Sequence, residues 1–408
     1  MDNGEFIFGG YRFDLNSGKA SFNYRIAGGE NFEFTEKIEF SATNSSIPPQ
    51  LLASLFQNIS LILGISYWKI YAPKKIEVEG FSLTKDQADF WNKVFTKGLG
   101  EFFYKNRIDF RGLINFPYNQ NTKLGPTVFP RRDRILLPIG GGKDSIVTAE
   151  ILKKDKKPFD VLVIGDFEIP LKVAETMEKR PIVIKRELDP KLFDLNKREN
   201  VYNGHIPVSV IYAFLGVLAA ILYDYSEIVV SNEKSANYGN VTYLGEEINH
   251  QWSKSEEFED MFGKYLAENI TTDIKYYSFL RDYTELEITE IFSKHPKYFR
   301  DFSSCNTNFR ISDSRPNQKW CGKCPKCLFV FTMLSAYITK QELVNIFGKN
   351  LFEDKNLLPY FKELLGWGEI KPFECVGTPQ EMETALNLAS RRGDLKGNFL
   401  MAFYENNK

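Results

Sequence analysis

A short apolar stretch that ends in three glycines constrains the fold of this chain more than any other feature. Residues 134–139 (RILLPI) are apolar after the first arginine, and Gly140, Gly141 and Gly142 follow directly. Residues 144–154 then repeat their apolar positions with helical spacing. A buried strand joined to a helix by such a tight turn is the repeating unit of a parallel α/β sheet. We therefore expect an α/β fold around this turn.

The alternation of strands and helices continues after the glycines. Residues 159–164 (FDVLVI), 181–184 and 227–230 are short apolar stretches typical of buried strands. Residues 208–223 have the length and apolar character of a helix, and they directly precede the last of these strands. Strands and helices that alternate at this spacing predict a doubly wound parallel sheet.

The two ends of the chain have a different pattern. Residues 5–45 alternate apolar and polar positions between glycines, which predicts antiparallel strands, while residues 51–65 and 84–104 have helical spacing. Residues 112–132 contain three prolines and several asparagines, as a linker does. Because 408 residues exceed one compact core, we predict three regions. They are a small N-terminal α+β domain (1–125), a catalytic α/β domain (126–340) and a helical C-terminal tail (341–408).

The glycine loop carries the groups needed to bind a phosphate. Backbone N–H groups of the three glycines can converge on an anion, and the next helix adds the positive end of its dipole. Lys143 adds a positive charge, Ser145 a hydroxyl group, and Asp144 the carboxylate expected beside a phosphate-bound Mg²⁺. The loop is not a Walker A motif, because an aspartate follows the lysine, and it is not a GxGxxG turn.

Four of the five cysteines form a second motif. Cys321, Cys324 and Cys327 lie within seven residues, and Cys305 lies sixteen residues upstream of them. Four thiolates at this spacing can close a tetrahedral structural Zn²⁺ site with no open position. An Fe–S cluster with the same four ligands remains open at this point.

Composition and charge exclude some classes of partner. The formal net charge is −1, so the chain lacks the basic excess of a dedicated nucleic-acid binder. The N-terminus has no signal-peptide pattern, and we expect a cytoplasmic protein with reduced cysteines. Residues 206–223 lack charges over a length at the lower limit of a membrane span. A strand-like stretch follows at once, so we expect a buried helix and no membrane contact.

Polar stretches lie where a parallel sheet binds its ligands, beyond the carboxyl ends of its strands. The stretch at 231–240 follows a predicted strand, and similar stretches occur at 203–207, 249–255 and 280–286. Their amide, hydroxyl and charged groups suit a substrate with many hydroxyls and carboxylates. Helix capping, for example by Ser253 or Ser255, is an alternative explanation for each stretch alone. The predicted substrate-binding residues are His205, Ser231, Asn232, Glu233, Asn237, Asn240, Asn249, Gln251, Trp252, Lys254 and Arg281.

The glycine loop resembles the PP-loop (SGGxDS) of N-type ATP pyrophosphatases, whose fold is HUP-like. Gly140 stands where that family usually has serine. The resemblance implies that residues 140–145 grip the pyrophosphate of ATP, and that ATP is cleaved to AMP and pyrophosphate. A PP-loop upstream of four such cysteines also resembles the 7-cyano-7-deazaguanine synthases, which adenylate a carboxylate and carry a zinc knot.

Several longer motifs together resemble the UDP-N-acetylmuramoyl-L-alanyl-L-glutamate epimerases, and the likeness extends over nearly the whole chain. These motifs are GGGKDS (140–145), SNEKSANYGN (231–240), NHQWSKSEEFE (249–259), FSSCN (302–306), WCGKCPKC (320–327) and FECVGTPQE (373–381). The resemblance implies an ATP- and Mg²⁺-dependent isomerase of peptidoglycan synthesis. Its substrate would be the UDP-linked muramoyl dipeptide, which gives a functional coupling to the ligase that makes UDP-MurNAc-L-Ala-L-Glu. Nothing in the sequence predicts the oligomeric state.

Epimerisation requires a group that moves the α-proton. His205 and His250 lie in the polar stretches, whereas His295 precedes a proline and should lie at the surface. Cys375, outside the four-cysteine motif, is either this proton-transfer group or a structural thiol. Lys254 and Arg281 would hold phosphates or carboxylates, or form surface ion pairs.

Three other functions remain as alternatives. One is a different carboxylate-adenylating enzyme, such as a 7-cyano-7-deazaguanine synthase-like enzyme, which would incorporate nitrogen from ammonia. A second is an RNA-modifying sulfurtransferase, which the charge balance disfavours. A third is a non-catalytic nucleotide sensor, which the Lys143-Asp144-Ser145 side chains disfavour.

Overall fold

A nine-stranded β-sheet forms the centre of the computed structural model, which describes residues 4–43, 46–122, 125–308 and 319–408. From one edge to the other the strands are β11 (Lys275–Ser278), β8 (Glu227–Val230), β5 (Ile135–Pro138), β6 (Phe159–Ile164), β7 (Ile182–Glu187), β3 (Phe32–Glu39), β2 (Lys19–Ala27), β1 (Glu5–Asp14) and β4 (Lys75–Val78).

The five strands from β11 to β7 run parallel, which confirms the prediction of a doubly wound sheet. The chain proceeds from β5 through β6 to β7 on one side, and then returns to β8 and β11 on the other side. The strand order therefore reverses at β5, and ligands of such sheets bind at the carboxyl ends of the strands at this point. The glycine loop follows β5 directly.

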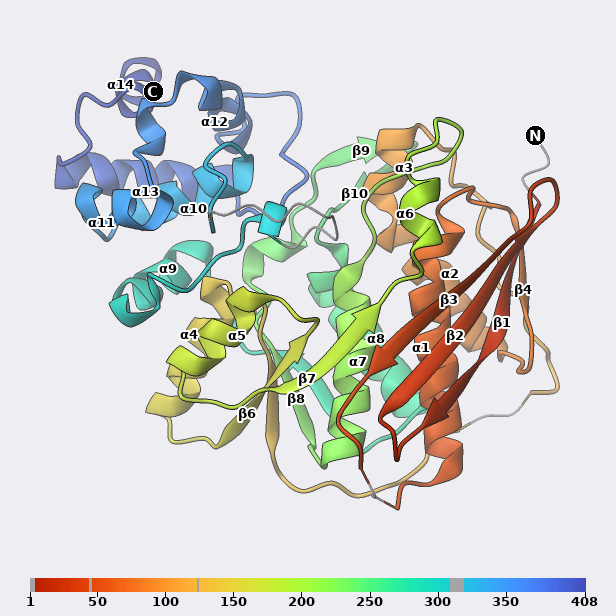
Figure 1. Cartoon of the computed structure of the whole chain (residues 1–408). Coiled ribbons are helices and arrows are strands. Elements are labelled where there is room, and N and C mark those ends of the chain that lie inside the picture. Colours follow the sequence, from red (N-terminus) through yellow and green to blue (C-terminus); the bar gives the residue numbers. More distant parts are fainter. Residues whose placement is uncertain (1–3, 44–45, 123–124, 309–318) are drawn as a thin grey trace.

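Helices cover both faces of the sheet, because neighbouring strand residues point to opposite sides. Leu136 packs into a core with α1 (Pro49–Trp68) and α7 (Val208–Tyr223), whereas Leu137 packs into a second core with α4 (Lys143–Lys154) and α5 (Glu168–Thr176). Figure 1 shows this layered arrangement. The sequence predicted α7 and β8 with the bounds that the structure has.

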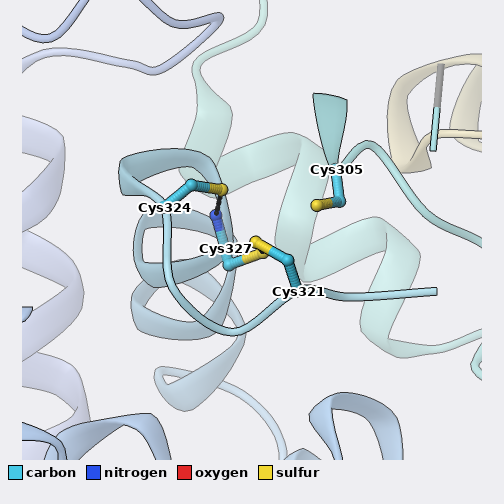
Figure 2. A group of neighbouring side chains, drawn as sticks. All are labelled: Cys305, Cys321, Cys324 and Cys327. Atoms are coloured by element: carbon cyan, nitrogen blue, oxygen red, sulfur yellow. Dashed lines mark hydrogen bonds between the residues drawn. The ribbon is translucent and has the colours of Figure 1, made fainter. Parts of the chain in front are cut away.

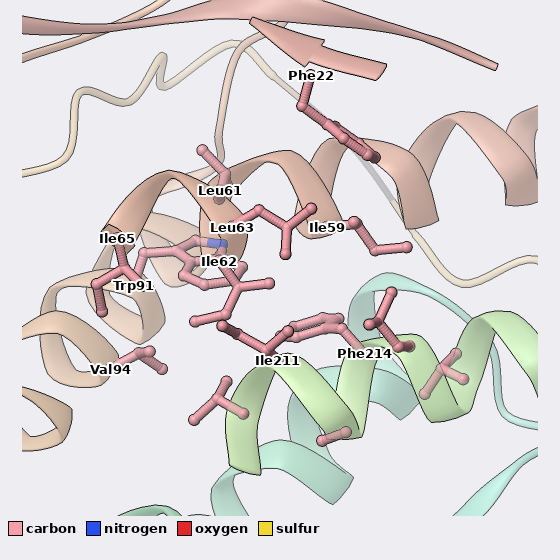
Figure 3. Close-up of a cluster of buried hydrophobic side chains, with 14 of the residues drawn as sticks. Phe22, Ile59, Leu61, Ile62, Leu63, Ile65, Trp91, Val94, Ile211 and Phe214 are labelled. Atoms are coloured by element: carbon pink, nitrogen blue, oxygen red, sulfur yellow. The ribbon is translucent and has the colours of Figure 1, made fainter. Parts of the chain in front are cut away.

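α1 and α7 are buried helices. Figure 3 shows Phe22 of β2 on one side of α1, and Ile211 and Phe214 of α7 on the other. Among the described residues, α1 alone is long and apolar enough to cross a membrane, and 83% of its apolar window is buried. The apolar stretch that ends at residue 223 is likewise buried along α7.

The antiparallel N-terminal strands extend the same sheet. β3 pairs with β7, and buried Glu36 of β3 forms an ion pair with Arg186 of β7. The sheet is thus continuous across residue 125, where the sequence analysis set a domain boundary. The predicted boundaries at 125 and 340 stay a prediction, since a continuous sheet does not test which segments fold on their own.

Some elements differ from their predicted form. The helix expected at 84–104 is divided into α2 (Lys85–Gly98) and α3 (Gly100–Asn106), because Leu99 leaves helical geometry. The strands β4 and β11 and the hairpin of β9 (Val241–Tyr243) and β10 (Glu246–Ile248) were not predicted. The described part of the 112–132 linker contains neither helix nor strand.

Helices make up the rest of the chain, and the predicted C-terminal tail is indeed helical. These α-helices are α6 (Lys191–Leu195), α8 (Glu256–Asn269), α9 (Glu285–Ser293), α10 (Pro325–Ser335), α11 (Lys340–Phe347), α12 (Leu358–Leu364), α13 (Pro379–Arg392) and α14 (Phe399–Asn407). The last five gather at one end of the molecule in Figure 1 and pack into the core that holds α4 and α5.

Candidate active site

The glycine loop has a backbone that only glycine adopts without strain. Gly141 has φ of +83°, and a Cβ there would lie 2.6 Å from Cγ2 of Ile169. A Cβ added at Gly140 would have no atom within 4 Å, so this position has room for a side chain. The Ser145 hydroxyl donates to the Gly142 carbonyl at 3.2 Å, and no side chain caps the N-terminus of α4 that follows the loop. The loop therefore has the form of an anion-binding turn.

Lys143 joins two carboxylates at the start of α4. Its side chain is 3% exposed and forms ion pairs with Asp144 and with Glu285 of α9. Burial raises the pKa of Glu285 to about 7. Burial would also raise the pKa of Asp144, but the charges of Lys143 and Lys326 outweigh it and lower that pKa. Asp144 is therefore an anion beside the glycine loop.

Cys375 lies among positive charges. The Lys254 ammonium donates to the Cys375 sulfur at 3.4 Å, and the Lys326 ammonium donates to the Cys375 carbonyl oxygen. Burial alone would raise the pKa of the thiol, but Lys254, His250 and Lys326 together lower it to about 6. The thiol is therefore mostly a thiolate at neutral pH, which is the state of a reactive cysteine.

His250 connects this thiol to a carboxylate from the N-terminal part of the chain. Its Nδ1 lies 2.5 Å from Oε2 of Glu101 in α3. Burial opposes the charged form, but hydrogen bonds to Cys375 and Glu101 raise the pKa of His250 to about 9. Despite its burial, the histidines and Lys105 lower the pKa of Glu101 to about 2. The three groups form a thiolate–imidazolium–carboxylate series.

His205 lies beside this series but carries no charge at neutral pH. The rings of His205 and His250 have centroids 4.4 Å apart, and Nδ1 of His205 lies 3.7 Å from Glu101. Burial and the charge of His250 lower the pKa of His205 to about 3. His295 lies elsewhere, partly exposed and 3.6 Å from Glu150.

The four predicted metal ligands come together. The sulfurs of Cys305, Cys321, Cys324 and Cys327 all lie within 4.8 Å of one another. Figure 2 shows the four side chains gathered in one place. Those of Cys321 and Cys327 are 3.6 Å apart. Four thiolates at 2.3 Å from one zinc ion would be separated by about 3.8 Å, so the cluster fits a single tetrahedral ion. It fits an Fe–S cube less well, because the cube would hold the sulfurs farther apart.

This cysteine cluster is tied to the glycine loop. The backbone N–H of Ser303 donates to the carbonyl of Gly141 at 3.0 Å, and the backbone N–H of Cys305 donates to the Ser303 hydroxyl at 3.1 Å. The Ser303 hydroxyl in turn donates to the Lys319 carbonyl at 2.6 Å. An ion that orders the cysteines would therefore also order one wall of the loop.

Several predicted substrate-binding side chains instead hold the loops of the site together. Asn240 bonds the backbone of His250 and Pro372, and Asn249 bonds the backbone of Ala236 and Gln251. The Arg281 guanidinium forms an ion pair with Glu259 and bonds the Lys254 carbonyl. Asn237 accepts from the backbone of Glu256, Gln251 donates to the Val376 carbonyl, and Trp252 donates to Glu257.

The remaining predicted residues lie at the carboxyl end of β8. The Ser231 hydroxyl accepts a hydrogen bond from Thr148 of α4 at 2.8 Å, which links this strand end to the glycine-loop helix. Asn232 is partly exposed, and Glu233 is 3% exposed.

Sequence reasoning missed three charged residues of the site. Glu285 was within a polar stretch but was not selected, and Lys326 was hidden between two metal-ligand cysteines. Glu101 belongs to a helix that shows only an amphipathic pattern. A charge next to a metal motif could have drawn attention to Lys326, whereas no local signal marks Glu101.

Family models match most of the chain. The model described as the MurL N-terminal domain matches residues 2–279, and the MurL C-terminal domain matches residues 301–407. These matches include the glycine loop in the first part, and the cysteine cluster and Cys375 in the second.

Three curated relatives share one name, UDP-N-acetyl-alpha-D-muramoyl-L-alanyl-L-glutamate epimerase. The relative from Xanthomonas oryzae is 40% identical over 83% of this chain and 75% of its own length. Those from Micromonospora and Salinispora tropica are 34% and 35% identical, over 95% and 94% of this chain and 87% and 84% of their own lengths.

Proposed function

Because the chain belongs to the MurL family of epimerases, we propose that it converts UDP-MurNAc-L-Ala-L-Glu to the D-glutamyl epimer, with cleavage of ATP to AMP and pyrophosphate. One observation supports this most directly. Lys254 donates to the Cys375 sulfur, and its charge also lowers the pKa of Asp144 in the glycine loop. A phosphate-binding turn and a thiolate therefore share one site, as activation followed by proton transfer requires.

The chemistry explains why ATP is needed. The α-proton of a peptidic glutamate is poorly acidic while the neighbouring α-carboxylate is charged. Attack of that carboxylate on the α-phosphate of ATP forms an acyl-adenylate and releases pyrophosphate. This mixed anhydride has no carboxylate charge, so removal of the α-proton gives an enolate. Reprotonation from the opposite face gives the D-centre, and hydrolysis releases AMP.

The glycine loop is the ATP site of this proposal. The three glycines would donate backbone N–H groups to the phosphates, and Lys143 and Ser145 would add a charge and a hydroxyl. Asp144 would bind Mg²⁺, since a carboxylate at this position is an anion and magnesium prefers oxygen ligands. Lys143 would then exchange part of its contact with Asp144 for contact with phosphate.

Cys375 and His250 are the proposed proton-transfer groups. The thiolate can accept the α-proton, and the charged His250 can donate a proton to the enolate. A proton passed from the thiol to the imidazole through their hydrogen bond then restores both groups. Glu101 holds Nδ1 of His250 and so keeps the ring directed at the thiol. His205, Ser231, Asn232 and Glu233 remain proposed contacts of the substrate.

The cysteine cluster would hold a structural Zn²⁺. Its four sulfurs leave no open coordination position, so the ion orders the chain and takes no part in proton transfer. The substrate is a small molecule of cell-wall precursor synthesis, and we expect the enzyme to act in the cytoplasm after the ligase that adds L-glutamate.

The test is an incubation of the purified protein with ATP, Mg²⁺ and UDP-MurNAc-L-Ala-L-Glu in D₂O. We expect AMP, pyrophosphate and D-glutamate that carries deuterium at the α-carbon. AMP release without inversion would refute the epimerase proposal, and nitrogen incorporation from ammonia would support the deazaguanine-synthase alternative. Inversion without AMP would refute the adenylate mechanism.

A further inference from the structure

Lys326 is a buried charge that forms no direct ion pair with a carboxylate in the described part of the chain. Its side chain is 5% exposed, and its ammonium donates to the neutral carbonyl of Cys375. Among residues 4–43, 46–122, 125–308 and 319–408, no carboxylate forms an ion pair with it. A buried ammonium is usually paired, because water no longer solvates it. The charge of Lys326 acts on Asp144 and on Cys375 without a direct ion pair, so the ammonium can still contact a further anion.

The position of Lys326 is set by the cysteine cluster. It is the second residue of α10, between Cys324 and Cys327, and Cys324 caps the helix by accepting from the Cys327 backbone N–H at 3.4 Å. The N-terminus of this helix of 11 residues adds its positive dipole to the ammonium. A metal held by the cysteines would thus fix a positive charge inside the site.

The charge of Lys326 acts on both reacting ends of the proposed site, and its ammonium contacts the Cys375 backbone directly. Its charge lowers the pKa of Asp144 on the ATP side and of Cys375 on the proton-transfer side. The carboxyl group that is adenylated must lie between these same two residues, since it reacts with ATP and is bonded to the α-carbon that Cys375 deprotonates.

We propose that the Lys326 ammonium binds the α-carboxylate of the terminal glutamate, an inference that rests on the proposed function. In the first step a carboxylate oxygen forms a bond to the α-phosphorus, and the bond to pyrophosphate breaks. The ammonium offsets the repulsion between the α-carboxylate and the phosphates of ATP. Loss of the α-proton places negative charge on the carbonyl oxygen of the acyl-adenylate, and the same ammonium stabilises this enolate.

A binding experiment without ATP tests this contact. The ligands are UDP-MurNAc-L-Ala-L-Glu, its α-carboxamide and its γ-carboxamide, titrated calorimetrically into the wild type and Lys326→Met. The wild type should bind the α-carboxamide about tenfold or more weakly than the substrate, whereas Lys326→Met should bind both within about twofold. The γ-carboxamide should change the affinity of both proteins by the same factor.

Lys323→Met is the matched control, because Lys323 is an exposed lysine of the same cysteine loop. It should behave as the wild type, and both variants should keep the wild-type metal content by elemental analysis. The assignment is overturned if Lys326→Met still discriminates against the α-carboxamide, or if it loses discrimination only against the γ-carboxamide. A wild type that binds no dipeptide and forms no AMP would instead refute the proposed function.

Discussion

The ammonium of Lys254 lies 3.4 Å from the sulfur of Cys375, although 121 residues separate them in the chain. Lys254 follows the β10 strand, and Cys375 lies between α12 and α13. The contact therefore unites the polar loops of the parallel sheet with the C-terminal helical part. The charge of Lys254 also lowers the pKa of Asp144 in the glycine loop, so one lysine acts on both the thiol and the loop.

Cys375→Ala should separate the two halves of the proposed reaction. Without the thiol no base takes the α-proton, so we expect epimerisation to fall by about 10²–10⁴-fold. Activation of the carboxylate needs only the glycine loop, so ATP–pyrophosphate exchange that depends on the substrate should persist. Equal loss of exchange and epimerisation would contradict the assignment of Cys375 to proton transfer.

Glu101→Gln should change the pH dependence of thiol reactivity. Against the effect of burial, Cys375 and the Glu101 carboxylate together raise the pKa of His250 to about 9, and charged His250 helps to lower the pKa of Cys375 to about 6. Without the negative charge the His250 pKa falls, the imidazolium is lost at lower pH, and the thiol pKa rises. The midpoint of the alkylation rate of Cys375 with iodoacetamide should move upward by about one to two pH units.

Lys105→Gln provides the control for this experiment. Lys105 forms an ion pair with the same carboxylate at 2.5 Å, but its side chain is 52% exposed. Solvent screens such a pair, so its loss should leave the alkylation midpoint within a few tenths of a pH unit. If Lys105→Gln shifted the midpoint as much as Glu101→Gln, the hydrogen bond between Glu101 and His250 would not be the cause.

Gly141→Ala should weaken ATP binding strongly, whereas Gly140→Ser should not. An alanine at 141 would be strained at φ of +83° and would press its Cβ against Ile169. A side chain at 140 meets no atom within 4 Å. Nucleotide titration should show at least about a tenfold loss of affinity for Gly141→Ala alone. Wild-type nucleotide affinity in Gly141→Ala would show that the turn is not the phosphate site.

Cys324→Ser should remove the metal and the activity together. The proposed ion orders Cys305, and the neighbouring Ser303 holds the Gly141 carbonyl, so its loss should loosen the ATP site. Elemental analysis should find about one zinc per wild-type chain and none in the variant. Iron in place of zinc would refute the zinc assignment, and full activity without metal would refute its structural role.

Local patterns were sufficient for much of the fold. α7 and β8 are uniformly apolar because both faces are covered, and such stretches are recognised without tertiary information. β4 (KIEV) and β11 (KYYS) escaped recognition because polar residues interrupt these four-residue strands, which leaves no continuous apolar stretch. The joining of the N-terminal strands to β7 also escaped, since strand pairing depends on contacts between distant segments.

The residues of the site likewise fall into those whose role the sequence indicates and those whose role it does not. Lys143 and Asp144 follow the glycines directly, and the cysteine ligands have a fixed local spacing, so the sequence alone indicates both motifs. Asn240 and Asn249 were expected to contact substrate because polar side chains after a strand suggest a ligand, yet here they bond backbone groups of adjacent loops. Composition does not distinguish these two uses of an amide.

The sequence by itself determined the parallel sheet, the glycine loop and the four-cysteine motif, because each depends on neighbours within about one turn or one strand. Only the tertiary structure decided which charges meet. Glu101, His250 and Cys375 come from segments far apart in the chain, and burial among one another sets their pKa values. Electrostatic coupling acts through space over a few ångströms, so no sequence spacing records it.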